Sequence, residues 1–260
     1  MRNGARAAII TTFFALALAN SASAAETVGS NLLADPGTGP APNVGFVQTV
    51  QPTGVTMPLT ATASGVIVSI SVRHGTSGAN PGVYGFRVLS GTSPNFTATG
   101  APAALPDFNW PANDTPGTRV FIPISGGAPT GIPIAAGQRL GMSRFSGTAG
   151  QGAQIWTALG GAMPGATLRT ASAHDTGTVN YAFSNANTEA LFQYVIQADA
   201  DGDGFGDETQ DLCVGTAGTD GGCAPIPARA TPAKAKKCKK KKKKKRAVPA
   251  KKCKKKAKKK

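Results

Sequence analysis

The sequence predicts an all-β protein: an antiparallel β-sandwich or jelly roll, followed by an acidic calcium loop and a disordered Lys-rich tail. Residues 25–198 contain seven to nine short apolar stretches, separated by turns rich in Gly, Pro and Asn. Amphipathic helices, which a parallel α/β fold needs between its strands, are not visible there. These 174 residues are enough for one domain with a sizeable core.

Alternation of apolar and polar residues predicts the individual strands. It is clearest in residues 65–72, where every second residue is Val or Ile, and in residues 84–88, where Tyr84, Phe86 and Val88 flank Arg87. Pro123 indicates an edge position for a strand over residues 120–124. We also expect strands around residues 140–142, 153–159, 178–183 and 190–198.

A long loop is expected over residues 89–116, which are rich in Pro, Thr and Asn. Trp110 lies in this loop and is the better candidate for an exposed platform that binds sugars, because amphipathic Trp is favoured at binding surfaces. Trp156 lies in an expected strand and is interpreted as a core residue.

The N-terminus has the three parts of a secretory signal peptide, residues 1–24. Arg2 and Arg6 precede an apolar run over residues 7–19, and Ala22-Ser23-Ala24 supplies the small residues of a cleavage site. The run is shorter than the ~20 residues that a membrane-spanning helix needs. We therefore expect no transmembrane span and a secreted or cell-surface protein that begins at Ala25.

An acidic segment, residues 199–223, follows the last expected strand. Ca²⁺ binds six to eight oxygens at ~2.3–2.6 Å, and carboxylates at alternate positions converge on one point when the backbone curls. Gly204, at the sixth position, permits the sharp turn. The expected ligands are the carboxylates and, at the seventh position, a backbone carbonyl: Asp199, Asp201, Asp203, Phe205, Asp207 and Asp211.

This segment resembles one unit of the thrombospondin type 3 repeat, Asp-x-Asp-x-Asp-Gly-x-x-Asp with a Cys nearby. The resemblance covers about 15 residues, from Asp199 to Cys213, and implies a calcium site. It departs at the twelfth position, where Gln210 stands in place of an acid. Either Asp211 reaches in through a small bulge, or Gln210 ligates through its amide oxygen. An EF-hand is similar too, but it needs a helix where a strand is expected here.

Four cysteines in an exported chain favour disulfides. Cys213 and Cys223 flank a Gly-rich stretch of nine residues and are the natural pair, which would fix the segment after the calcium loop. Cys238 and Cys253 lie among the lysines of the tail. Three connectivities are open on the sequence alone.

Charge is divided unequally along the chain. Residues 25–198 are neutral, the acidic segment carries −7, and residues 229–260 carry +20. Residues 224–260 are too polar to bury a core and are expected to be disordered. Such a tail binds polyanions, and export favours polyanionic polymers of the cell envelope, with nucleic acid as a secondary partner.

The sequence offers few catalytic groups. It has two histidines, His74 and His174, and the acids of residues 25–198 are scattered without a local pair. The first hypothesis is therefore a non-enzymatic adhesion or display module that binds calcium and is attached to the envelope electrostatically. A carbohydrate-binding, lectin-like sandwich is the alternative. A glycan hydrolase on a jelly roll is a third, and it would need two carboxylates brought together by folding.

Overall fold

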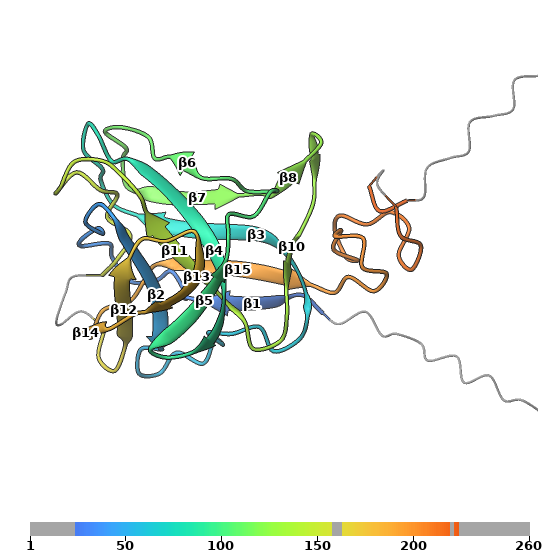
Figure 1. Cartoon of the computed structure of the whole chain (residues 1–260), viewed down its shortest axis with the longest axis horizontal. Coiled ribbons are helices and arrows are strands. Elements are labelled where there is room, and N and C mark those ends of the chain that lie inside the picture. The colour runs from blue at the N-terminus through green and yellow to red at the C-terminus, as the bar shows by residue number, and fades with distance from the viewer. Residues whose placement is uncertain (1–23, 158–162, 219–220, 224–260) are drawn as a thin grey trace, which may run out of the picture. The chain divides into compact units, whose positions relative to one another are not determined.

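The computed structural model describes residues 24–157, 163–218 and 221–223, all within one compact unit, Met1–Pro225. The predicted signal peptide, apart from Ala24, and the predicted Lys-rich tail lie outside the described residues. The described part of the chain is all-β, with antiparallel sheets packed face to face and no helix, which confirms the predicted fold class (Figure 1). It follows that none of the described residues form a helix able to cross a membrane.

Five strands form the first sheet, in the order β1-β15-β3-β10, with β7 also paired to β3. Strand β3 is central and aligns with β15 along most of its length. The strands are β1 (Glu26–Gly29), β15 (Phe192–Gln197), β3 (Gly65–His74), β10 (Ile132–Ile134) and β7 (Gly117–Phe121).

Eight strands form the second sheet, in the order β13-β5-β4-β11-β2-β12-β14, with β6 also paired to β4. They are β13 (Thr176–Asn180), β5 (Asn95–Thr99), β4 (Val83–Thr92), β11 (Arg139–Arg144), β2 (Val44–Val50), β12 (Thr167–Ser172), β14 (Phe183–Ala186) and β6 (Phe108–Asn109). A small hairpin pairs β8 (Ile124–Ser125) with β9 (Ala128–Pro129).

The main core lies between the two sheets. Phe46 and Phe86 from the second sheet meet Phe192 from the first, with ring centroids 6.3 Å apart in both pairs. Trp156 packs edge-on against Phe46 at 5.1 Å, so its predicted place in the core is confirmed. Alternating residues of β4 and β15 fill this core, as their sequence pattern predicts. In β3 the alternation holds for Ile70 and Val72, but the next core residue is Ile67, because the pairing with β15 shifts register at Val68.

A second apolar cluster covers the opposite face of the second sheet. Phe46 of β2 and Val88 of β4 belong to the main core, whereas the next residue of each strand, Val47 or Leu89, belongs to this outer cluster. Successive side chains of a strand point to opposite faces of the sheet. Phe96 and Tyr181 complete the outer cluster with an edge-to-face contact at 5.5 Å. The middle strands of this sheet are therefore buried on both faces.

Four sequence predictions are wrong in detail. The strand expected over residues 178–183 is divided between the end of β13 and the start of β14. Residues 89–116 are not one long loop, because they include the end of β4 and all of β5 and β6. A strand was expected over residues 153–159; of these the structure describes 153–157, where only Trp156 forms β-bridges, to Thr38 and Ala190. The strand expected over residues 120–124 ends at Phe121 with β7, and Ile124 belongs to the hairpin of β8 and β9. Val120 and Ile124 are 59% and 51% exposed.

Candidate metal centre

The acidic loop curls around the carboxylate of Asp199, directly after β15 and Ala198 (Figure 1, orange). Asp199 Oδ1 accepts hydrogen bonds from the backbone N–H of Gly202 at 2.9 Å and Asp203 at 3.1 Å, and Oδ2 accepts one from Gly204 at 3.1 Å. Gly204 has a φ of +89°, a left-handed conformation that favours glycine. The turn predicted at the sixth position is therefore present.

Three carboxylates gather at this turn. One oxygen each from Asp199, Asp201 and Asp203 lies within 4.8 Å of the other two. Asp207 and Asp211 lie outside this group; Asp207 Oδ1 accepts a hydrogen bond from Ala200 N–H and Asp211 Oδ1 accepts one from Cys213 N–H. Ligation by all six residues stays a prediction, and the structure gathers the carboxylates of the first three of them.

Two buried oxygens of the loop fit a bound cation. Oδ2 of Asp201 and Oδ2 of Asp211 are inaccessible to solvent and have no hydrogen-bond partner among the described residues. An unpaired buried carboxylate is costly, and a cation removes that cost. Burial raises the pKa of Asp199 despite the hydrogen bonds it accepts, because desolvation disfavours its charged form. A donor set made only of oxygens suits a hard cation such as Ca²⁺.

The structure also separates the two candidates for the last ligand. Gln210 Oε1 accepts a hydrogen bond from Gly206 N–H at 3.2 Å, and Gln210 Nε2 donates one to the carbonyl of Thr130 at 3.1 Å. Both ends of this amide are thus engaged by the protein. Asp211 is only 9% exposed, and its Oδ2 is unpaired. Of the two residues, Asp211 has the oxygen that lacks a partner.

A disulfide joins Cys213 to Cys223, as predicted. The ring that it closes holds two of the acids. Gly218 N–H donates to Asp203 Oδ2 at 3.0 Å, and Cys213 N–H donates to Asp211 Oδ1 at 2.6 Å. Gly222 packs so closely on Asp211 that an added Cβ would lie 1.9 Å from Oδ1. Residues of the disulfide ring therefore hold the carboxylates of Asp203 and Asp211 in place.

The loop is attached to the sandwich through backbone contacts with the segment between β9 and β10. The carbonyl of Gly204 accepts hydrogen bonds from Gly131 N–H at 2.6 Å and from Thr130 Oγ1 at 3.2 Å. On the other side, Oε1 of buried Gln197 accepts hydrogen bonds from the backbone N–H and the hydroxyl of Thr209. The acidic loop is thus part of the described fold and packs against the first sheet.

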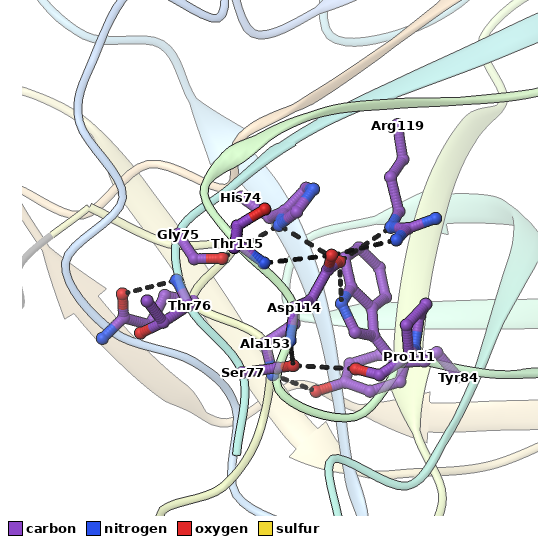
Figure 2. A network of polar contacts seen from close by, with 12 residues as sticks. His74, Gly75, Thr76, Ser77, Tyr84, Pro111, Asp114, Thr115, Arg119 and Ala153 are labelled. Carbon is purple, nitrogen blue, oxygen red and sulfur yellow. Dashed lines mark hydrogen bonds and ion pairs between the residues drawn. The ribbon is translucent and has the colours of Figure 1, made fainter. Parts of the chain in front are cut away.

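A second polar cluster surrounds Asp114 (Figure 2). Its carboxylate accepts hydrogen bonds from Arg119 Nε at 2.8 Å, Arg119 Nη2 at 3.0 Å and Trp110 Nε1 at 3.2 Å. His74 Nδ1 lies 3.6 Å from Asp114 and 2.9 Å from the carbonyl of Gly75. The hydrogen bonds of Arg119 lower the pKa of Asp114 and outweigh its desolvation. These contacts bind the segment after β6 to β3.

The same cluster corrects the prediction for Trp110. This side chain is only 3% exposed and packs against His74 and Tyr84, with ring centroids 5.2 and 5.3 Å away. It therefore cannot serve as the predicted sugar platform. His74 is buried beside it.

Folding brings Asp107 and Asp175 to one guanidinium, although they are far apart in the sequence. Arg87 is 1% exposed and donates hydrogen bonds to Asp107 from two nitrogens and to Asp175 from one. Burial opposes the charge of Arg87, but these hydrogen bonds raise its pKa overall. Each carboxylate is thus engaged in an ion pair across the outer face of the second sheet.

The chain matches no protein-family model, no curated protein and no solved structure. Its function is therefore argued from its own residues.

Proposed function

We propose that this protein is a secreted or cell-surface calcium-binding module without catalytic activity, which serves adhesion or display. The observation that carries the proposal is the acidic loop. Three carboxylates lie within 4.8 Å of one another, and two buried carboxylate oxygens have no partner in the part of the chain that the structure describes. Ca²⁺ at this turn would offset the repulsion among the acids and pair the orphaned oxygens.

Calcium would act here as a structural ion. It would be held by Asp199, Asp201 and Asp203, with the predicted contributions of Phe205, Asp207 and Asp211. Since Gly204 at the centre of the turn is hydrogen-bonded to Gly131, an ordered loop also fixes the end of the sandwich next to β10. A single loop of this kind is expected in the extracellular affinity class, with a dissociation constant of ~10⁻⁴–10⁻³ M.

Isothermal titration of the chain from Ala25 with calcium chloride tests the proposal. We expect a saturable heat in that range for the parent chain and a loss of about tenfold or more in affinity for Asp201→Asn. Glu208→Gln is the matched control, because it removes the same charge from an exposed side chain outside the carboxylate group. Equal weakening by both variants, or no heat at millimolar calcium, would contradict a specific site.

Attachment to the envelope is proposed to come from the tail, residues 229–260, with its charge of +20. Counterion release makes such binding strong at low salt and weak at high salt. Retention on an immobilised anionic polysaccharide should be lost when residues 229–260 are deleted. Retention that survives the deletion would place the polyanion site on another part of the chain.

A further inference from the structure

A cleft of about 780 Å³ opens between the two sheets, beside the acidic loop. Strand β10 forms one wall of the cleft. Residues 99–104, which begin at the last residue of β5, form the other. Val88, Ile132 and Ile134, which belong to the main core, form its apolar lining. This volume lies within the ~300–1,000 Å³ of sites that bind small molecules in proteins.

The polarity of the lining indicates the kind of ligand. Besides its aliphatic side chains, the cleft presents polar groups such as Ser64, Ser125 and Gln138, and Asp199 is the one ionisable side chain among the described residues that line it. An anion would be repelled by the acidic loop, which carries −7. A cation would compete with calcium for Asp199. A neutral molecule with an apolar body therefore fits this cleft best.

The wall of the cleft is also tied to the loop. Thr130 and Gly131 line the cleft and donate hydrogen bonds to the carbonyl of Gly204, while Gln210 Nε2 donates to the carbonyl of Thr130. Gly131 has no room for a side chain, because an added Cβ would lie 2.3 Å from Cβ of Val66. An ordered acidic loop thus holds one wall of the cleft in place.

We propose that this cleft binds a neutral, largely apolar small molecule, and that calcium in the acidic loop strengthens this binding by ordering the wall at Thr130 and Gly131. The calcium effect rests on the function proposed above, whereas the cleft itself does not. By linkage, a bound ligand strengthens calcium binding by the same factor.

Fluorescence titration with two related dyes tests the proposal on the chain from Ala25 to Lys260. N-phenyl-1-naphthylamine is neutral, and 1-anilinonaphthalene-8-sulfonate adds one negative charge to the same rings. Because the +20 tail also attracts the sulfonate, the two dyes are compared only by the signal that the substitution Ala103→Trp, described below, removes. By that measure we expect the neutral dye to bind at least about tenfold more tightly. Equal binding of the two dyes would overturn the assignment of a neutral ligand.

Ala103→Trp locates the binding, because Ala103 is exposed on the cleft wall and a Trp there would fill the space. Ala182→Trp is the matched control, since Ala182 is exposed and does not line the cleft. Only Ala103→Trp should weaken binding of the neutral dye, by about tenfold or more. Equal affinity of the two variants would show that the dye binds elsewhere and would overturn the site.

The calcium effect is measured with the same neutral dye. Millimolar calcium should tighten dye binding about fivefold or more in the parent chain and leave Asp201→Asn unchanged. If calcium binds by calorimetry but does not change dye affinity, the coupling is wrong. If calcium does not bind at all while Ala103→Trp still blocks the dye, the proposed function fails and the cleft stands.

Discussion

The substitution Gly222→Ala tests whether Asp211 belongs to the calcium site. Gly222 has a φ of +79°, and a Cβ there would lie 1.9 Å from Asp211 Oδ1 and 2.5 Å from its Cγ. Contacts below 3.0 Å are not tolerated, so the Asp211 carboxylate must move. Displacing a group that holds or orients a ligand costs about 10- to 100-fold in metal affinity.

Gly215→Ala is the control for backbone strain. Gly215 lies in the same disulfide ring with a φ of +82°, but a Cβ there meets nothing within 4 Å. Both variants therefore carry the similar cost of a left-handed alanine, about 1 kcal/mol, and only Gly222→Ala moves Asp211. Calcium titration calorimetry on both variants measures the difference. If Gly222→Ala binds calcium as tightly as Gly215→Ala, Asp211 is not a ligand and the reasoning from its unpaired oxygen is refuted.

The remaining predictions concern the disulfide and two buried polar groups. Replacing both Cys213 and Cys223 by Ser should weaken calcium binding about tenfold, because residues of the disulfide ring are hydrogen-bonded to Asp203 and Asp211. An unchanged calcium affinity by calorimetry would show that the disulfide does not support the calcium site. Asp114→Asn should reduce the loss of thermal stability at acid pH. The pKa of Asp114 is lowered from 3.8, so its carboxylate stabilises the fold above that pH, and this stabilisation is lost as pH falls through the pKa of the folded state. Melting temperatures of the variant and the parent chain that fall in parallel below about pH 5 would contradict this. Arg144→Met should lower the free energy of unfolding by about 3 kcal/mol, because the carbonyls of Pro40, Pro81 and Thr148 lose their donor; a urea midpoint equal to that of the parent chain would contradict it.

Local sequence patterns predicted the acidic loop well. The turn at Gly204 and the disulfide between Cys213 and Cys223 each involve residues no more than ten positions apart, so the spacing of residues in the sequence was enough to predict them. The same holds for the second half of β3, where Ile70 and Val72 belong to the core and the less buried Ser71 lies between them. The attachment of the loop to Gly131 was not visible, because it joins residues 73 positions apart through backbone atoms.

Strands without alternation were missed for a physical reason. In β2, Phe46 and Val47 are both fully buried, because apolar clusters cover both faces of the second sheet. A strand that is buried on both faces carries apolar residues on both, so its sequence lacks the alternation of apolar and polar residues that predicts a strand. Trp110 was misplaced for a related reason: its neighbours His74 and Tyr84 come from other strands, so a segment with the composition of a loop became part of the core.

A crystal structure of the chain grown with millimolar calcium tests the central claim most directly. We expect one ion in the acidic loop, bound by oxygens of Asp199, Asp201 and Asp203 at ~2.3–2.6 Å, with Asp211 Oδ2 turned to the same ion. A loop that keeps its fold but has water and no anomalous calcium signal among these carboxylates would contradict it.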